Sequence, residues 1–264
     1  MPSGEAVRRV AVLTGRHDAG IDDALERLRR VAAAEGVEVV DEHGEPHLVV
    51  VLGGDGTMLR ALHRFGRAGI PVLGVNFGRV GFLTSFGPDE LEAELSRVLA
   101  GSYVVHPLPT LVVVAGEERR IALNDVVGTS SILGRMIEVG WGVGGEDLGV
   151  QPCDGIICAT PSGSTAYNLS SGGPVLVWGL DAMVVTFVAP HSLHARPLVV
   201  PRGQTLSVRN ETADIGITVV ADGQSFGELQ PGDGFTCVLD EGAALLATPP
   251  ESTFFKRFEK HFAR

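Results

Sequence analysis

Lysine is almost absent from this chain of 264 residues, whose only two lysines, Lys256 and Lys260, lie near its C-terminal end. A P-loop of the GxxxxGK[ST] type needs a lysine that reaches the nucleotide phosphates, so this motif is excluded. A Schiff-base lysine is likewise excluded from the first 255 residues. Any phosphate recognition must therefore come from backbone amides, helix N-termini, arginine side chains or a metal.

Other absences restrict the class of protein. No apolar run approaches the roughly 20 residues of a membrane helix, and residues 1–9 lack the apolar core of a signal peptide. Three cysteines do not make a disulfide framework, which suits a reducing compartment. The net charge of −11 argues against a broad contact with nucleic-acid phosphates. We therefore expect a cytoplasmic protein that has neither a nucleic acid nor a membrane as its partner.

Two hydrophobic patterns divide the chain. In residues 1–104, continuous apolar runs such as 48–52 alternate with amphipathic stretches such as 21–35. This alternation of strand and helix predicts a Rossmann-like, parallel α/β domain. In residues 105–248, short apolar segments are separated by Gly, Pro and Asp turns, which predicts an antiparallel, β-sandwich-like domain.

The last residues, 249–264, are expected to return to the first domain. Phe254, Phe255, Phe258 and Phe262 recur there at helical spacing. We interpret this aromatic stripe as core packing of a C-terminal helix against the α/β domain.

A glycine-rich turn follows the apolar run at 48–52 and reads Gly53-Gly54-Asp55-Gly56-Thr57. Glycines let backbone amides approach a phosphate, and the N-terminus of the helix that we predict to begin near Thr57 adds partial positive charge. A carboxylate at this place would repel phosphates, so Asp55 makes sense as a general base for an attacking hydroxyl or as a holder of Mg²⁺. A tight turn in which Asp55 caps the helix is the structural alternative.

Three further motifs offer polar groups to a nucleotide. Asn124-Asp125, within a strand predicted to begin at Ile121, can bind a ribose diol or an adenine amino group. The segment 160–168 supplies hydroxyl groups and the flat ring of Tyr167, and 222–224 reads Asp-Gly-Gln. A local bulge, a helix N-cap and a hairpin turn are the respective structural alternatives.

Taken together, these motifs resemble the bacterial NAD kinase family. The likeness spans roughly residues 45–245 and rests on GGDGT, the segment 73–83, Asn124-Asp125, the segment 160–167 and Asp-Gly-Gln at 222–224, in this order. The resemblance implies a two-domain kinase that phosphorylates the adenosine ribose 2′-hydroxyl of NAD to give NADP, with ATP or polyphosphate as the donor. It also implies a divalent metal, usually Mg²⁺, and a homodimer or homotetramer.

The resemblance assigns roles to individual positions, with Asp55 as the general base. The positions implied for the donor phosphates are Gly53, Gly54, Gly56, Thr57 and Arg79. Those implied for NAD are Gly56, Leu59, Phe82, Asn124, Asp125, Asp154, Ser162, Thr165, Ala166, Tyr167, Asn168, Ser170, Ala189 and Gln224. The chain departs from the family at Pro152, where members often carry an arginine, so the contact made by that arginine stays open.

Two other functions remain open at this point. GGDGT is shared with lipid kinases, which would want an apolar cleft or a basic membrane-facing surface, and this chain is acidic. A non-catalytic NAD(P)-binding regulator would keep the pocket without turnover. The motifs do not determine four further properties: the phosphoryl donor, the preference between NAD and NADH, feedback by NADPH and the number of subunits.

Overall fold

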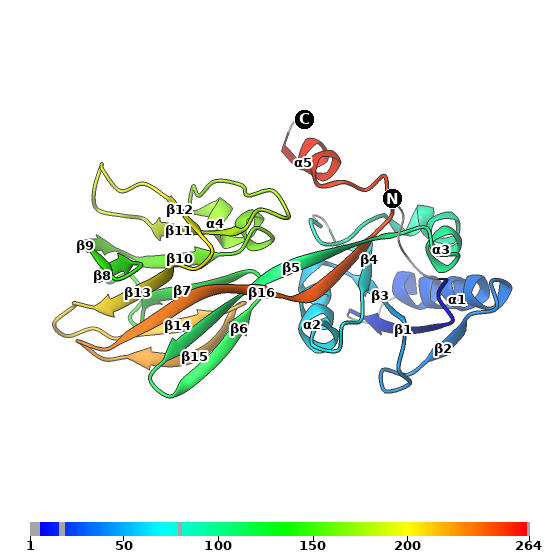
Figure 1. Cartoon of the computed structure of the whole chain (residues 1–264), viewed down its shortest axis with the longest axis horizontal. Coiled ribbons are helices and arrows are strands. Elements are labelled where there is room, and N and C mark those ends of the chain that lie inside the picture. Colours follow the sequence, from blue (N-terminus) through cyan, green and yellow to red (C-terminus); the bar gives the residue numbers. More distant parts are fainter. Residues whose placement is uncertain (1–5, 16–18, 79–80, 263–264) are drawn as a thin grey trace. The chain divides into compact units, whose positions relative to one another are not determined.

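The computed structural model describes residues 6–15, 19–78 and 81–262, and of residues 241–243 it describes the backbone alone. The chain forms two compact units (Figure 1). The α/β unit comprises Met1–Pro107 and Ala243–Arg264, and the β unit comprises Leu108–Gly242. Among the described helices, none combines the length and the apolar character that crossing a bilayer requires.

A parallel sheet forms the centre of the α/β unit, with its strands in the order β2-β1-β3-β4 and the end of β16 parallel to β4. The elements of this unit are β1 (Arg9–Thr14), α1 (Ala19–Ala34), β2 (Glu38–Val40), β3 (Leu48–Gly53), α2 (Asp55–Gly66), β4 (Val72–Asn76), a 3₁₀ turn η1 (Pro88–Glu90), α3 (Leu91–Leu99) and α5 (Phe254–Phe262).

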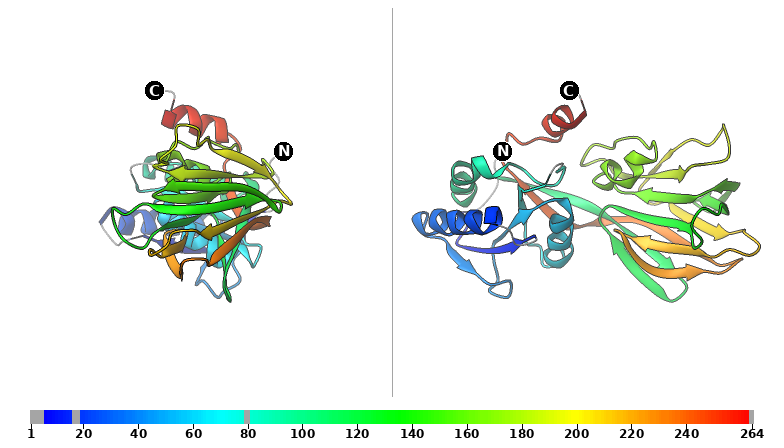
Figure 2. Two further views of the ribbon diagram at one scale, coloured as in Figure 1. Left: turned by 90° about the vertical axis from the view of Figure 1, so that its left-hand side faces the viewer. Right: turned by 180° about the vertical axis from the view of Figure 1, so that it is seen from behind.

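Both faces of this sheet are covered, which explains the unbroken apolar run of β3. Leu48, Val50 and Leu52 lie in one cluster with the apolar sides of α1 and α3. Helix α2 packs on β3 and β4, and Figure 2 shows it on the opposite side of the sheet from α1. A strand enclosed in this way buries all of its residues, and every residue of β3 is buried. The predicted Rossmann-like fold is confirmed.

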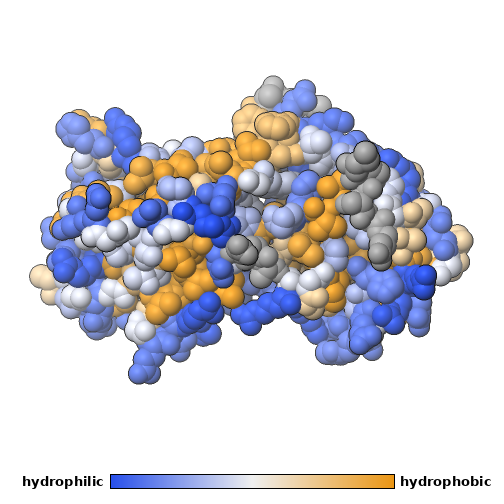
Figure 3. Space-filling view, in the orientation of Figure 1, coloured by the Kyte–Doolittle hydropathy of each residue, from blue (hydrophilic) through white to orange (hydrophobic). Residues whose placement is uncertain are grey.

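Helix α5 packs on the α/β unit, as predicted, but Phe254 alone of the four phenylalanines of the stripe is buried. Phe254 and Arg257 are buried, whereas Phe255 is 67% exposed. Apolar surface accordingly remains visible where Figure 1 places α5 (Figure 3). The interpretation of the whole aromatic stripe as core is therefore wrong, because the buried face of the helix includes a cation.

The β unit consists of two antiparallel sheets. One has the order β12-β11-β10-β7-β14-β15, and the other contains β16-β13-β8-β9, with β5 pairing with β16 and β6. The elements are β5 (Val104–Ala115), β6 (Glu118–Ala122), β7 (Asp125–Ser130), β8 (Ile137–Val143), β9 (Glu146–Cys153), β10 (Gly155–Ala159), a 3₁₀ turn η2 (Gly163–Thr165), α4 (Tyr167–Ser170), β11 (Ala182–Val188), β12 (Leu198–Pro201), β13 (Thr205–Asn210), β14 (Ile217–Ala221), β15 (Gln224–Leu229) and β16 (Gly234–Thr248).

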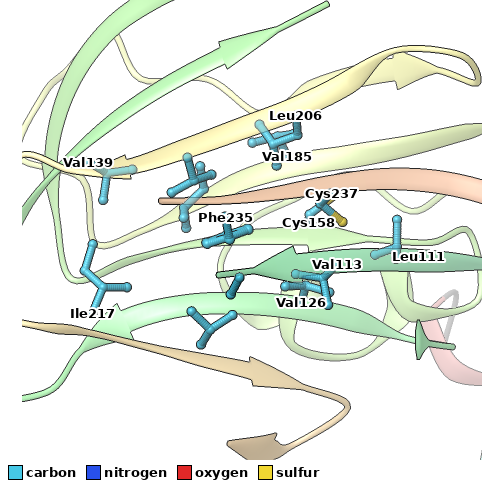
Figure 4. Packing of buried hydrophobic residues seen from close by; sticks show 14 of the residues in the cluster. Leu111, Val113, Val126, Val139, Cys158, Val185, Leu206, Ile217, Phe235 and Cys237 are labelled. Atoms are coloured by element: carbon cyan, nitrogen blue, oxygen red, sulfur yellow. The ribbon is translucent and has the colours of Figure 1, made fainter. Parts of the chain in front are cut away.

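The core of the β unit lies between these sheets (Figure 4). It takes Val126 and Cys158 from one sheet and Leu206 and Cys237 from the other. Side chains from two facing sheets form one continuous cluster only in a sandwich. The predicted β-sandwich-like domain is thus confirmed, and it is built without disulfides, since all three cysteines of the chain are free and buried.

Candidate functional site

The glycine-rich turn joins β3 to α2 at the carboxyl end of the parallel sheet. Strand β3 ends at Gly53, Gly54 is the N-cap, and Asp55 is already the first residue of the helix. The carbonyl of Gly54 accepts the N–H groups of Thr57 and Met58 at 2.9 and 3.1 Å. The helix therefore begins two residues before the expected Thr57, which places the carboxylate of Asp55 at the positive end of the helix dipole.

The glycines of this turn serve different physical needs. A Cβ on Gly53 would lie 2.8 Å from Oγ1 of Thr57, so Gly53 is required by local packing. A Cβ on Gly56 would meet nothing within 4 Å, and Gly56 is exposed. The surface above Gly56 is therefore open to a ligand, whereas Gly53 is closed off by its own helix.

This difference predicts opposite outcomes for two alanine variants. Gly53→Ala should lose about 1–3 kcal/mol of stability because the new methyl overlaps Thr57. Gly56→Ala should keep the wild-type melting temperature but lower kcat/KM for the phosphoryl donor by about tenfold or more, since the methyl obstructs the position that the family resemblance implies for the donor phosphates. Thermal unfolding and steady-state kinetics of the two proteins check this pair. A fully active Gly56→Ala enzyme would contradict the phosphate role.

The carboxylate of Asp55 is held by the backbone of a neighbouring loop. Oδ2 accepts the N–H of Phe82 at 2.8 Å, and Oδ1 accepts the N–H of Leu83 at 3.1 Å. Burial raises the pKa of Asp55 above its ordinary value, while these backbone hydrogen bonds and the charge of Arg257 act in the opposite direction. The result is a half-buried carboxylate that binds a proton more tightly than a free aspartate does.

Two other predicted residues of the α/β unit are Phe82, which belongs to this loop, and Leu59, which lies on α2. The ring of Phe82 is buried and packs against α5, with ring centroids 5.8 Å from Phe254, 5.1 Å from His261 and 5.6 Å from Phe262. Leu59 is partly buried on α2. Arg79, predicted to help with the donor phosphates, lies outside the described residues.

In the β unit, the side chain of Asp222 holds the segment that contains Asn124 and Asp125. Its two oxygens accept the N–H groups of Leu123, Asn124 and Asp125 at 2.7, 2.7 and 3.1 Å. The predicted strand through Ile121 is consequently broken, since β6 ends before Leu123 and β7 starts at Asp125. The strand assignment of Asn124 was wrong because Asp222 captures the amides that a sheet would use.

Asp222 itself lies in the turn between β14 and β15. Its φ is +46°, and Gly223 follows with φ +77°. Two successive residues in the left-handed region make a hairpin turn of the kind that favours Asp-Gly. The hairpin alternative is thus correct for this motif, and the turn aims a carboxylate at Asn124-Asp125. Gln224, the first residue of β15, is exposed beside it.

Asp125 is a buried carboxylate, 7% exposed, next to a second one. Burial, followed by the charge of Asp222, raises its pKa from 3.8 to about 6, although a hydrogen bond from the backbone of Tyr167 favours the charged form. The charged form of Asp125 is therefore disfavoured, and a hydrogen-bond donor that binds to it would stabilise that form.

The raised pKa of Asp125 predicts a specific dependence of stability on pH. Between pH 4 and pH 6 the folded protein keeps a proton that the unfolded chain releases, so the free energy of unfolding falls as the pH rises. Asp125→Asn removes this term, and without nucleotide the variant should be more stable than wild type by about 1–3 kcal/mol above pH 6. Melting temperatures from pH 4.5 to 8 check it, with the exposed Asp214→Asn as the control. Parallel pH curves for wild type and Asp125→Asn would contradict the assignment.

The segment after β10 combines buried and accessible side chains. The hydroxyl of Thr160 donates to the carbonyl of Leu123 at 2.6 Å and lies 2.9 Å from Oγ of Ser162. Asn168 is fully buried and accepts the hydroxyl of Thr186 at 2.7 Å. The accessible members of this predicted group are Thr165, Ala166, Tyr167 and Ser170. The buried hydroxyls and amide therefore hold the turn in place beneath the exposed ring of Tyr167.

Two predicted residues, Asp154 and Ala189, lie at the other end of β10. Asp125 pairs with the last residue of β10, whereas the N–H of Asp154 donates to the carbonyl of Val188 beside the first. The two ends of a five-residue strand are separated by about 14 Å. Ala189 has φ +43°, a conformation that costs an alanine free energy and that clusters at functional sites.

The predicted residues therefore gather into separate groups. One surrounds Asp55 in the α/β unit, a second joins Asn124, Asp125 and Tyr167 in the β unit, and a third contains Asp154 and Ala189. Sequence reasoning missed Arg257 and His261 on α5, whose guanidinium and ring contact the loop that holds Asp55. The sequence did contain a signal for them. Arg257 and His261 are four residues apart, and Phe254, three residues before Arg257, lies on the same helical face.

Comparison with protein families assigns most of the chain to two consecutive domain models. Residues 22–103 match the ATP-NAD kinase N-terminal domain, and residues 123–241 match the ATP-NAD kinase C-terminal domain. These matches contain the GGDGT turn and the Asn124-Asp125 and Asp222 segments respectively.

Whole proteins of this kind are similar over most of the chain. The NAD kinase of Heliobacterium modesticaldum is 36% identical over 257 residues, which cover 96% of this chain and 91% of the relative. The NAD kinase of Symbiobacterium thermophilum is 42% identical over 80% of this chain and 75% of its own. An Archaeoglobus fulgidus NAD kinase solved in complex with ATP is 30% identical, with a TM-score of 0.77 over 97% of both chains. Yeast NADH kinase solved with NADH shares the fold, with a TM-score of 0.83 and 20% identity over 98% of this chain and 88% of its own.

Proposed function

The chain belongs to the NAD kinase family, and from this premise we propose how its residues carry out the reaction. The protein is a kinase that transfers a phosphate to NAD with ATP as the donor. We propose that the acceptor is the 2′-hydroxyl of the adenosine ribose, so that the product is NADP. Family membership also decides against the lipid kinase that the GGDGT turn alone left open.

The observation that carries the proposal is the position of Asp55. Its half-buried carboxylate lies at the N-terminus of α2, directly beside the open surface of Gly56. Burial raises its pKa, which makes it a stronger base than a free aspartate. In the proposed reaction Asp55 accepts the proton of the 2′-hydroxyl, the hydroxyl oxygen bonds to the γ-phosphorus, and the bond to the β,γ-bridging oxygen breaks to release ADP.

The donor phosphates are proposed to lie on the amides of Gly54 and Gly56 at the helix N-terminus, beside Thr57, whose own N–H is taken by the carbonyl of Gly54. The partial positive charge there favours anions, and phosphoryl transfer needs positioning and charge neutralisation more than covalent chemistry. We propose that Mg²⁺ arrives on the phosphates of ATP. The described residues include no group of three or more His, Cys, Asp or Glu side chains arranged for a metal, and Mg²⁺ commonly binds through substrate phosphates and water.

The β unit is proposed to bind the adenosine end of NAD. Asn124 and Asp125 offer an amide and a carboxylate at a strand end, where Asp222 fixes their backbone. A ribose hydroxyl or an adenine amino group that donates to Asp125 would stabilise its charged form. Tyr167 provides an exposed ring for a base, and Ser162 and Asn168 support the turn from below. Gln224 flanks the same strand end, while Thr165, Ala166 and Ser170 complete its rim.

A homo-oligomer, either a dimer or a tetramer, is proposed as the working form. Asp154 and Ala189 lie at the far end of β10 from Asp125, where a second subunit could use them. Among the described strands β9 pairs with β8 alone and exposes Leu148 and Val150. Light scattering of the purified protein measures the number of subunits, and a monomer would contradict this part of the proposal. The three unpaired cysteines fit a cytoplasmic enzyme.

The test is direct formation of NADP. Purified protein is incubated with NAD, ATP and Mg²⁺, and NADP is detected with an NADP-specific dehydrogenase. Parallel reactions replace ATP by polyphosphate and NAD by NADH, which settles the donor and the acceptor in one experiment. Tight binding of NADP without turnover would overturn the proposal in favour of a non-catalytic regulator.

A further inference from the structure

Two peptide groups of one loop connect the C-terminal helix to the proposed base. The peptide group between Gly81 and Phe82 gives its N–H to Oδ2 of Asp55 at 2.8 Å, and its oxygen lies 3.2 Å from Nε2 of His261. The next peptide group, between Phe82 and Leu83, gives its N–H to Oδ1 at 3.1 Å, and its oxygen accepts Arg257 at 2.7 Å. Each carboxylate oxygen is thus linked through a single peptide to one side chain of α5.

A peptide group transmits such a constraint because it is planar. Fixing the direction of the carbonyl fixes the direction of the N–H on the other side of the same plane. A donor on the oxygen also polarises the amide, which strengthens the hydrogen bond that its N–H makes. Since a carbonyl oxygen accepts only, Nε2 of His261 must carry the proton in this contact.

The guanidinium of Arg257 is buried and makes several hydrogen bonds to the loop. Arg257 is 5% exposed and also donates to the carbonyl of Thr84, to Oγ of Ser85 at 3.1 Å and to Oγ of Ser252 at 3.0 Å. Burial lowers its pKa to about 10, against the charge of Asp55. A buried cation costs free energy, and Arg257 compensates with hydrogen bonds to the same loop that holds the base.

The helix presents these groups together because of their spacing. Phe254, Arg257 and His261 follow the pattern i, i+3, i+7 and therefore lie on one face. Phe254 packs against the ring of Phe82 at 5.8 Å, which anchors this face on the loop. The backbone N–H of Lys256 donates to Oγ1 of Thr253, which fixes the first turn of α5.

We propose that Arg257 and His261 are positioning residues for phosphoryl transfer, which act through the peptide groups 81–82 and 82–83 to aim the carboxylate of Asp55. The C-terminal helix is then part of the catalytic apparatus although it contacts no reacting atom. This inference rests on the proposed function of Asp55 as the base, so its test is designed to separate the two.

The first arm of the test compares single variants. Arg257→Met should lower kcat about 10- to 100-fold, and His261→Leu about three- to tenfold, with KM for NAD and ATP within about threefold of wild type. Arg257→Lys and His261→Gln keep one donor each and should recover part of the rate. Lys260→Met removes an exposed charge from the same helix and should have wild-type kinetics. Melting temperatures show whether each protein is folded. If Arg257→Met does not fold, the kinetics of His261→Leu test the inference instead.

The second arm is a double-mutant cycle with Asp55→Asn. If Arg257 acts through the carboxylate, Arg257→Met should change the residual rate of the Asp55→Asn enzyme by less than about twofold. An equal loss in both backgrounds would overturn the inference, because it indicates a general structural role. If Asp55→Asn is inactive but Arg257→Met and His261→Leu have wild-type rates, the positioning role of these two residues is overturned, while the proposed role of Asp55 as the base stands. A fully active Asp55→Asn enzyme would overturn the proposed base as well.

Discussion

Asp55→Asn is expected to lower kcat for NADP formation by about 10²–10⁴-fold while leaving KM for NAD and ATP nearly unchanged. The variant keeps the shape of the side chain and one oxygen that can accept an N–H from the loop, but it removes the site for the proton. The protein should remain folded, because burial disfavours the charged form of Asp55 and a neutral amide avoids that cost. Initial rates of wild type and variant over a range of NAD and ATP concentrations provide the measurement.

Asp89→Asn provides the matched control, since Asp89 is an exposed carboxylate of the same unit. The pH profile of wild type adds an independent readout. The rate should fall as the pH drops through the pKa of the base, and the raised pKa of Asp55 places that limb above the range of an ordinary aspartate. Asp55→Asn activity within about threefold of wild type would remove Asp55 from the mechanism.

Asp222→Ala is expected to have the largest effect on stability. The substitution leaves the three amides of Leu123, Asn124 and Asp125 without their charged acceptor. It also places an alanine at φ +46°, where a Cβ is strained. Hydrogen bonds to charged groups contribute about 1.5–3 kcal/mol each but are not additive, so we expect a loss of about 3 kcal/mol. Part of the loss is offset because Asp125 no longer faces a like charge.

A loss of this size should lower the melting temperature by about 6–12 °C for a chain of this length. KM for NAD should rise as well, since the backbone of Asn124 and Asp125 is no longer held. Asp222→Asn tolerates the left-handed backbone and keeps one acceptor, so it should lie between wild type and Asp222→Ala. Asp214→Ala, an exposed position in the same unit, is the control. An unchanged melting temperature for Asp222→Ala would show that the three amides are satisfied in another way.

The fold class was predictable because its signals are local. A strand buried on both faces, such as β3, needs a continuous apolar run, and a helix buried on one face, such as α1, needs apolar residues three or four positions apart. Both patterns are present in the sequence, and both elements appear in the structure as expected. The GGDGT turn was located correctly for the same reason, although α2 begins at Asp55 instead of Thr57. Composition alone removed the P-loop, because the only two lysines, Lys256 and Lys260, lie near the C-terminal end and neither follows a GxxxxG pattern.

The errors arose where a distant side chain replaces a local interaction. The run from Ile121 looks like a strand, yet Asp222 takes the amides that would have continued the ladder, across about 100 residues of sequence. The aromatic spacing of α5 suggested a uniform apolar face, yet the loop at 81–85 presents carbonyl oxygens and selects Arg257 instead. Neither contact has a periodic signature, so neither could be read from the pattern.

By itself, the sequence determined the two kinds of sheet, the absence of a lysine-based phosphate site and the chemical groups available to a nucleotide, since these follow from residue type and short spacing. Only the tertiary structure decided which carboxylate is held by which amides, that Asp222 anchors Asn124-Asp125, and that α5 reaches the loop around Asp55. The physical reason is that directional hydrogen bonds between segments far apart in the chain exist only once the backbone has brought them within about 3 Å.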